Sequence, residues 1–264
     1  GITQEDINRV YQSAILASVP DTHEVLHILP NTFFVDKQRK MDIPLGERCA
    51  QLEVEAHIVM ISKTVVTALV NAIENFDIHI IGVVANSIVA MQTLPRTSTS
   101  LTLFMDVGAG TTELILYRGQ EIYYSISLPL GGDYITNDIM QGFTISYNHA
   151  EEIKKYYGKL DKKLRGQNII LDFNDYGTTD KQFAYDFLYD IIESRIEEII
   201  YLIKESLKST CLEDDIEVVF LTGGCGAMPS FADNAEKLFG VPIQVVTSKD
   251  LPLEYVSSVN VACY

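Results

Sequence analysis

Hydrophobic and polar positions change their spacing several times along the first 84 residues. Apolar residues recur at helical spacing over residues 7–15, directly after the N-cap signal Thr3-Gln-Glu-Asp6. Residues 51–61 alternate between apolar and polar, which is the pattern of a half-buried strand. Shorter strands are predicted at residues 25–29 and 32–35, on either side of a Pro-Asn break. These elements describe a small sheet with a helix beside it.

A second helix and a further strand complete this pattern. One face of the helix is apolar and carries Val65, Leu69, Ile73 and Phe76. The apolar run at residues 78–84 predicts a buried strand. Residues 1–84 therefore form one predicted α+β unit, and residues 85–264 form the rest of the fold.

Two apolar runs in the second part are joined by a short glycine-rich loop. The first run, residues 101–105, ends at Asp106, and the second begins at Leu114. This pattern predicts a strand, a tight loop and a strand. A dinucleotide-binding fingerprint is excluded, because Glu113 stands where the third glycine belongs and a strand follows where a helix is needed.

The composition of this loop suggests a phosphate site. Its backbone carries no bulky side chains, so successive N–H groups can point into one concavity and hold phosphate oxygens. Asp106 would lie beside that anion, where a carboxylate is favourable only with a hydrated Mg²⁺ between them. An ordinary glycine-containing hairpin turn has the same spacing, and the loop residues alone leave both interpretations open.

The remaining elements alternate between helices and short strands. Helices are predicted within residues 133–157, where the charged positions also fit plain solvated faces. The polar stretch 159–179, around a short strand at 169–171, predicts a hairpin or surface arm. A long helix is predicted over residues 182–208, followed by a buried strand at 218–221.

Some positions in this region are assigned to the core or to a ligand. The residues of the long helix that we expect to face the core are Phe183, Phe187, Ile191, Ile199, Ile203 and Leu207. After the strand come Gly223 and Gly224, which either let a ligand approach the backbone or make a plain strand-to-helix turn.

Composition and net charge limit the partners that this chain is expected to bind. The 264 residues are 47% hydrophobic and 21% charged, as in a soluble globular chain. A net charge of −16 repels nucleic-acid phosphates and anionic lipids, so neither is an expected partner of the bare surface. Four scattered cysteines fit a reducing cytoplasm, and four histidines near residues 23–79 lack ligand spacing and are taken as strand or core residues.

Several motifs together resemble a known family. The D-x-G-x-G-T-T hairpin resembles the second phosphate loop of actin-like ATPases. The segments L-P-L-G-G-D-Y-I-T-N-D-I, A-E-E-I-K-K-Y-Y-G, I-I-E-S-R-I-E-E-I and L-T-G-G-C-G-A-M-P, in this order, resemble the bacterial cell-division family FtsA. The resemblance covers nearly the whole chain. It implies an α/β, actin-like (ribonuclease H-like) ATPase fold with an inserted small α+β subdomain.

The same resemblance implies a division into subdomains. Residues 1–84 are similar to the inserted FtsA subdomain 1C. Within residues 85–264 it implies a nucleotide-binding hairpin at 101–132, a 2B-like region within 133–210 and a Gly-Gly adenosine motif at 218–240.

The resemblance also assigns ligands to residues. Asp106 would organise Mg²⁺ through water. The distal phosphates of ATP would be cradled by Gly108, Ala109, Gly110, Thr111 and Thr112. Glu151 and Lys154 would contact the ribose and the adenine. The purine ring would pack on Gly223, Gly224 and Gly226. Arg195, and less clearly Lys181, would bind the acidic C-terminal tail of the tubulin-like protein FtsZ.

Two departures from the family pattern set further expectations. Nothing before Leu101 matches the first phosphate hairpin, D-x-G-[ST], and the chain stops at Tyr264 without the family's amphipathic membrane tail. We therefore expect an incomplete chain whose membrane contact depends on a segment that is not in this sequence. We also expect an ATP-binding family member with at most weak ATPase activity. The isolated chain is expected to bind Mg-ATP weakly or not at all and to have no useful ATPase activity.

Three functions remain open at this point. The first is an FtsA-like scaffold that self-associates into filaments and links FtsZ to the inner face of the cell membrane at the division site. The second is a PilM-like type IV pilus assembly protein that binds a membrane-protein peptide. The third, an actin-fold kinase, is disfavoured because no acidic general base stands out in an additional substrate-binding segment.

Overall fold

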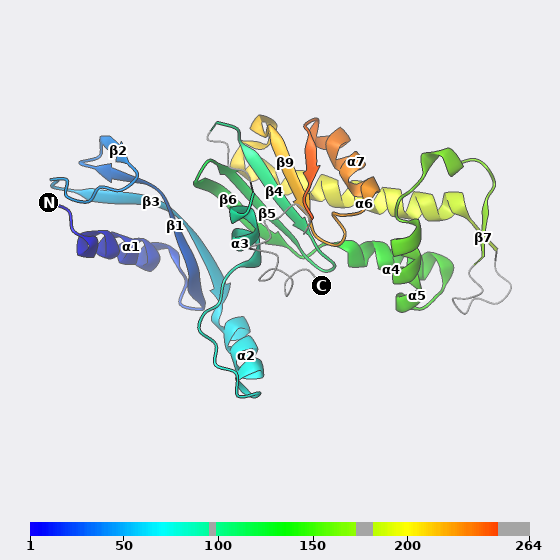
Figure 1. Cartoon of the computed structure of the whole chain (residues 1–264), viewed down its shortest axis with the longest axis horizontal. Coiled ribbons are helices and arrows are strands. Elements are labelled where there is room, and N and C mark those ends of the chain that lie inside the picture. Colours follow the sequence, from blue (N-terminus) through cyan, green and yellow to red (C-terminus); the bar gives the residue numbers. More distant parts are fainter. Residues whose placement is uncertain (95–98, 173–181, 248–264) are drawn as a thin grey trace. The chain divides into compact units, whose positions relative to one another are not determined.

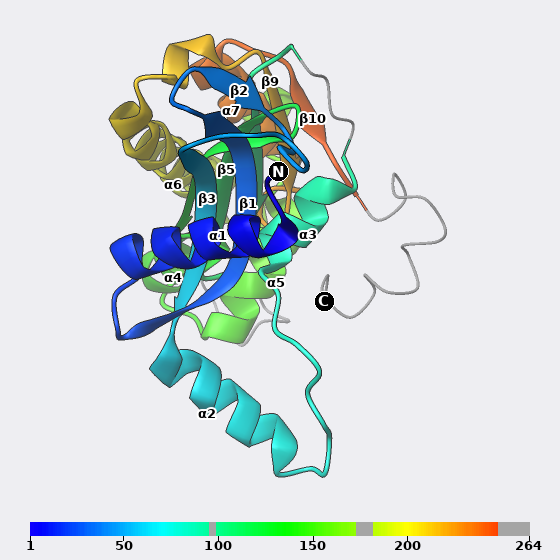
Figure 2. The same cartoon turned by 90° about the vertical axis from the view of Figure 1, so that its left-hand side faces the viewer.

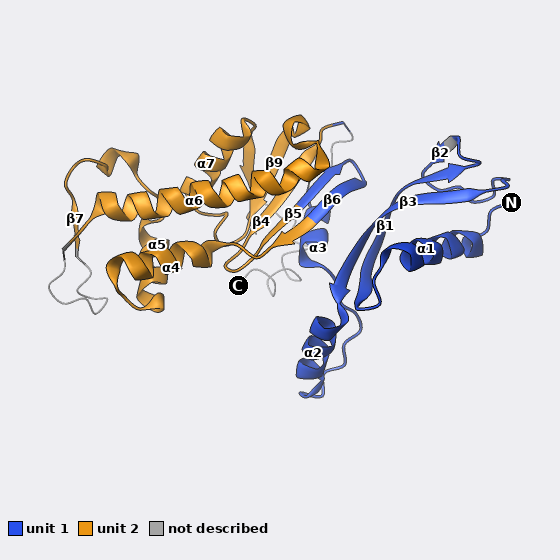
Figure 3. Ribbon diagram, turned by 180° about the vertical axis from the view of Figure 1, so that it is seen from behind, with its two compact units in different colours: residues 1–99, 115–125 blue, residues 100–114, 126–264 orange. Residues whose placement is uncertain are grey.

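The computed structural model describes residues 1–94, 99–172 and 182–247 of the chain (Figure 1). These residues divide into two compact units, drawn in different colours in Figure 3. The first unit holds residues 1–99 and 115–125, and the second holds residues 100–114 and 126–264.

The first unit contains a three-stranded antiparallel sheet with the strand order β2-β1-β3. Its strands are β1 (His23–Val35), β2 (Arg39–Met41) and β3 (Leu52–Ser62). Helix α1 (Gln4–Ser18) crosses one face of this sheet (Figure 2). The helix begins at the predicted N-cap signal, where Thr3 and Asp6 form a capping box and satisfy each other's backbone N–H groups.

A small apolar core joins α1 to the sheet. Its buried members come from the N-terminal segment, α1 and β1, and are Ile2, Ile7, Phe33 and Val35. Partly buried neighbours such as Tyr11 and Val54 extend it. Strand β3 contributes Leu52 and Val54 to this core. The predicted strand at residues 51–61 is confirmed.

Strand β1 differs from the prediction of two strands and a break. It runs continuously from His23 to Val35, and its pairing with β3 shifts register between Pro30 and Thr32. Asn31 is the extra residue of this bulge. Its side-chain amide donates to the Ile122 carbonyl at 2.8 Å and accepts from the Ile122 N–H at 3.1 Å. The bulge accommodates Pro30 within β1, so the strand continues where the sequence predicted a break.

The predicted strand at residues 78–84 is wrong. Helix α2 (Lys63–Glu74) forms as expected, but residues 78–84 follow it in an irregular conformation, and the next element is helix α3 (Asn86–Gln92). Ile81 is 98% exposed, and Val65 and Leu69 on α2 are exposed as well. An apolar run forms a strand only when it pairs with a neighbour, and residues 78–84 pair with none of the described strands.

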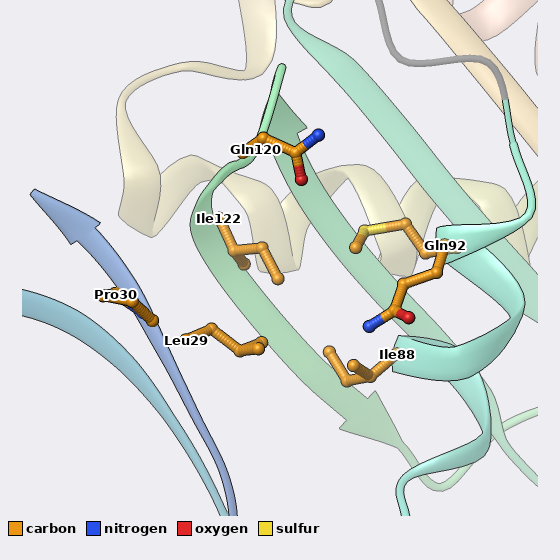
Figure 4. A pocket seen from close by; sticks show the side chains of 7 residues that line it. Leu29, Pro30, Ile88, Gln92, Gln120 and Ile122 are labelled. Carbon is orange, nitrogen blue, oxygen red and sulfur yellow. The ribbon is translucent and has the colours of Figure 1, made fainter. Parts of the chain in front are cut away.

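The first unit also holds a cavity of about 500 Å³ (Figure 4). Its lining residues come from β1, α3 and the edge of β6 (Glu121–Leu128), and are Leu29, Pro30, Ile88, Met91, Gln92, Gln120 and Ile122. Two amide side chains are the polar groups among them, so this lining supplies no acid, base or charged ligand.

The larger sheet has five strands in the order β10-β9-β4-β5-β6. Strands β4 (Thr102–Val107), β5 (Thr112–Arg118) and β6 follow one another along the chain. Strand β9 (Val218–Thr222) lies parallel to β4, and β10 (Ile243–Val245) lies parallel to β9. Residues 101–105 and 114–117 are fully or almost fully buried, as their apolar pattern predicted.

Helices α4 (Gly132–Phe143), α5 (Tyr147–Tyr157), α6 (Tyr185–Leu207) and α7 (Pro229–Phe239) complete the second unit, with short 3₁₀ helices at Lys162–Leu164, Lys208–Thr210 and Glu213–Asp215. The short strand predicted at residues 169–171 is present as β7 (Ile170–Asp172), which pairs antiparallel with β8 (Gln182–Ala184), a strand beyond the predicted arm at 159–179. The long helix therefore begins three residues later than predicted. Its buried stripe runs through Leu188, Ile192, Ile196 and Ile203, whereas Phe187 is 48% exposed.

Candidate functional site

The loop between β4 and β5 is held by its carbonyl groups. The carbonyls of Gly108 and Ala109 accept hydrogen bonds from the N–H groups of Gly132 and Asp133, at 2.9 and 2.8 Å. These two N–H groups belong to the first turn of α4, where a helix has donors to spare. The loop is thereby tied to the start of α4.

The N–H groups of the loop remain available. The Gly108 N–H closes the turn by donating to the Thr111 carbonyl at 2.9 Å. Within the described chain, the N–H groups of Ala109, Gly110 and Thr111 donate to no other group, and all three residues are exposed. Three consecutive free donors, with the carbonyls turned the other way, suit an anion.

Close packing around the loop explains its small residues. A Cβ atom added at Gly131 would lie 2.5 Å from the Ala109 carbonyl oxygen, so glycine is needed there for this contact. Thr112 is fully buried and its hydroxyl donates to the Leu130 carbonyl at 2.8 Å. The hydroxyl proton of Thr112 is thus already engaged in holding the loop.

Asp106 lies at the end of β4, beside the loop. Burial, and after it the negative charge of Glu113, raises the pKa of the Asp106 carboxyl. A nearby cation would relieve this charge. Mg²⁺ prefers one or two carboxylates together with phosphate oxygens and water, so the donor set of Asp106 and Glu113 beside an anion-binding loop fits that ion.

Glu151 and Lys154 of α5 meet at a buried hydroxyl. Lys154 is buried, with 7% of the residue exposed, and its ammonium lies 2.6 Å from the Glu151 carboxylate. It also donates to the Thr136 hydroxyl at 2.8 Å and to the Gly132 carbonyl at 3.1 Å. The Thr136 hydroxyl in turn donates to Glu151 at 2.6 Å. Burial raises the pKa of Glu151, but the bonds from Lys154 and Thr136 outweigh it and leave that pKa below its ordinary value.

The turn after β9 packs against the end of β4 and forms a further part of the site. A Cβ atom at Gly223, where φ is +91°, would lie 2.5 Å from an Asp106 carboxylate oxygen. A Cβ atom at Gly132 would lie 3.2 Å from both the Cys225 Cβ and the Lys154 ammonium. The structure thus brings together Asp106, the loop, the Glu151–Lys154 pair and the turn that contains Gly223, Gly224 and Gly226.

Three residues of this site escaped the sequence analysis. They are Asp133, Thr136 and Tyr147. The Tyr147 hydroxyl donates to an Asp133 carboxylate oxygen at 2.7 Å. This bond, supported by desolvation, raises the pKa of Tyr147 to about 12. The available signal was the i, i+3 spacing of Asp133 and Thr136, which places both on one face of α4.

Arg195 lies elsewhere in the second unit, in a cavity of about 340 Å³ between α4 and α6. Its guanidinium forms a bidentate pair with Asp138, at 2.5 and 2.9 Å, and a third bond to Glu198 at 2.6 Å. The remaining lining residues are Asp190, Ile191 and Ser194. Lys181, the other predicted partner-binding residue, lies outside the described residues.

Among the helices that the structure describes, none has both the length and the hydropathy to cross a bilayer.

Comparisons with known proteins agree with the sequence motifs. The family model for cell division protein FtsA matches residues 103–263, and a model for the SHS2 domain inserted in FtsA matches residues 1–60. The FtsA of Bacillus subtilis is 29% identical over 249 residues, covering 93% of this chain and 57% of that protein. The FtsA of Pseudomonas aeruginosa is 28% identical over 256 residues, covering 92% and 60%.

Solved structures share the fold. The PilM–PilN type IV pilus biogenesis complex has a TM-score of 0.62 at 16% identity, covering 98% of this chain and 69% of that one. MreB 5 of Spiroplasma citri, bound to AMPPNP, has a TM-score of 0.56 at 16% identity, covering 75% and 64%. These structural similarities confirm the predicted actin-like α/β fold. No function is inferred from them.

The first FtsA relatives are longer than this chain, which spans 61% of the protein from Buchnera aphidicola. The predicted boundary at residue 84 and the roles of the individual site residues stay predictions. The family is established by the model that matches 161 of the 264 residues, from 103 to 263. The chain belongs to the FtsA family of bacterial cell-division proteins.

Proposed function

We propose that this chain is the nucleotide-binding and partner-binding part of an actin-like scaffold of bacterial cell division. The observation that carries the nucleotide site is the loop at residues 108–111. Its Gly108 and Ala109 carbonyls accept hydrogen bonds from the first turn of α4, while the N–H groups of residues 109–111 have no acceptor among the described residues. Phosphate oxygens of ATP would accept from these donors. Asp106 would hold the hydrated Mg²⁺, which neutralises phosphate charge when bound.

The other half of the nucleotide would lie toward α5 and the turn after β9. A ribose hydroxyl can donate to the Glu151 carboxylate, whose orientation is fixed by Lys154 and Thr136. The backbone at Gly224 leaves room for a flat purine, because nothing lies within 4 Å of the place where a side chain would begin. We expect this site to bind nucleotide and to contribute at most weak ATPase activity.

Mg-ATP binding tests this assignment. Because the described residues offer phosphate donors on one loop only, we expect a dissociation constant of about 100 µM or weaker. Titration followed by amide NMR should shift the resonances of residues 109–111 and of Glu151 and Lys154. Asp106→Asn should weaken the Mg-ATP response, since it removes the carboxylate that holds the ion.

A matched control separates the site from general electrostatics. Glu152→Gln removes an exposed carboxylate on the same helix as Glu151 and should leave the titration unchanged. Shifts that avoid residues 109–111, or an unchanged response in Asp106→Asn, would contradict the proposed phosphate site. Low-micromolar binding would show that the expectation of one-sided contact is wrong.

The scaffold function needs contacts to other chains. We propose that the first unit self-associates, and the support for this is the edge strand β3, which has 11 residues and pairs on one side with β1. We propose that the cavity around Arg195 binds the acidic tail of FtsZ, at the inner face of the membrane at the division site. The guanidinium of Arg195 is the cation in the lining of that cavity.

Arg195→Glu tests the partner. We expect it to weaken binding of an FtsZ tail peptide by about 30-fold or more, because attraction to a carboxylate becomes repulsion. Calorimetric titration measures this, with a peptide from a pilus membrane protein as the PilM-like comparison. Lys208→Glu makes the same charge change at an exposed position near the end of α6 and should have little effect. Equal losses in both variants would refute a specific role for Arg195.

A further inference from the structure

Arg195 already has a carboxylate partner within its own chain. Asp138 accepts two hydrogen bonds from the guanidinium, from Nε at 2.5 Å and from Nη2 at 2.9 Å. This is the parallel, bidentate geometry by which an arginine binds the carboxylate of any ligand. The position that a peptide carboxylate would take on Arg195 is therefore filled by Asp138.

The guanidinium is fixed in place by other contacts. Glu198 accepts from Nη1 at 2.6 Å, and the Tyr134 ring lies under the guanidinium, 5.6 Å from its carbon to the ring centre. Tyr134 and Asp138 are four residues apart on α4, so one face of that helix presents both. Arg195 would keep its orientation if Asp138 left.

The Arg195–Asp138 pair is open enough to exchange. The side chain of Arg195 is 25% exposed and that of Asp138 is 28% exposed. Ion pairs that water reaches contribute little net stability, and a released Asp138 carboxylate would be rehydrated. The remaining acids of the cavity, Asp190 and Glu198, repel a second carboxylate, so an acidic ligand can bind well only where it replaces Asp138.

We infer that Asp138 is an internal competitor for the peptide site, and that a peptide carboxylate binds Arg195 by displacing it. This inference rests on the proposed function, because it takes an acidic peptide to be the ligand of the cavity. It predicts that the isolated protein binds such a peptide more weakly than its arginine allows. Any change that moves α4, or that draws Asp138 away, would raise the affinity.

The test is calorimetric titration of the chain with an FtsZ tail peptide, comparing two variants. Asp138→Asn keeps the size of the side chain but removes the competing charge, and should raise the affinity by about 10-fold. Asp190→Asn removes one charge from the same cavity, yet Asp190 pairs with Arg165 and makes no contact to Arg195. It should raise the affinity by no more than about 3-fold, through reduced repulsion.

The outcomes separate this inference from the proposed function. Equal gains in Asp138→Asn and Asp190→Asn, or no gain in Asp138→Asn, would overturn the competition by Asp138, while loss of binding in Arg195→Glu would still support the peptide site. If Arg195→Glu has no effect, the peptide site itself fails. Should Asp138→Asn not fold, Asp138→Ser offers the same comparison. The ¹⁵Nε–H resonance of Arg195 is a second readout, because in free Asp138→Asn it should move away from its wild-type position.

Discussion

Gly223→Ala is expected to lower the free energy of unfolding by about 3 kcal/mol or more. Gly223 has a φ of +91°, a conformation that L side chains rarely adopt. Its added Cβ would lie 2.4 Å from the Val107 carbonyl oxygen and 2.5 Å from an Asp106 carboxylate oxygen. Backbone atoms of a buried strand cannot move aside easily, so strain and overlap add up. Denaturant unfolding, compared through its midpoint and slope, measures the loss.

Gly224→Ala is the matched control. A Cβ atom at Gly224 would meet nothing within 4 Å, and its φ lies outside the left-handed range. We expect a change within about 0.5 kcal/mol, because an alanine there restricts the unfolded chain at no steric cost. A Gly223→Ala protein as stable as Gly224→Ala would mean that the turn after β9 does not pack against the end of β4 as the structure has it.

The sequence predicted the loop between β4 and β5 well because its signals are local. A buried strand, two glycines and a second buried strand occur within twenty residues, and neighbouring residues decide their conformation. The capping box at Thr3 and Asp6 is local in the same sense and was also found. Strand β1 was harder, since its bulge is stabilised by the bond of Asn31 to Ile122, 91 residues away.

The failures have a common physical cause. Residues 78–84 carry strand-forming side chains, but a strand exists only with a paired neighbour, and pairing is not written in the run itself. The start of α6 was placed too early because residues 182–184 pair with β7. Both outcomes depend on contacts between segments far apart in the sequence, to which apolar periodicity is insensitive.

The site residues also divide into those that local sequence motifs identify and those that depend on distant contacts. Asp106, the loop, Glu151, Lys154 and the glycine turn were named from motifs, and the structure gathers them. Thr136 and Asp138 were missed, because a threonine or an aspartate on a helix face is usually solvated. Their importance arises from partners on other helices, namely Lys154 for Thr136 and Arg195 for Asp138. No spacing rule within α4 identifies those partners.

Lys154→Met is expected to destabilise the fold by about 2–3 kcal/mol near pH 7. The ammonium that it removes is buried and bonds to Glu151, Thr136 and the Gly132 carbonyl. Methionine fills similar space but leaves the half-buried Glu151 carboxylate with the exposed and more distant ammonium of Lys155 as its cation. Lys155→Met is the control, since Lys155 lies 3.5 Å from the same carboxylate but is 71% exposed. Its effect should stay within about 0.5 kcal/mol.

The pH dependence of this difference identifies the group responsible. In the wild type, burial raises the pKa of Glu151, but Lys154 and Thr136 together hold it below the ordinary value of 4.5, so the ionised carboxylate stabilises the fold above that pH. That contribution is lost as the pH falls through the folded pKa. In Lys154→Met, burial without the ammonium should raise the pKa of Glu151, and protonation should then relieve the variant. The stability deficit of Lys154→Met should therefore shrink between about pH 7 and pH 4. A deficit that stays constant over this range would show that Lys154 acts through packing and not through the charge of Glu151.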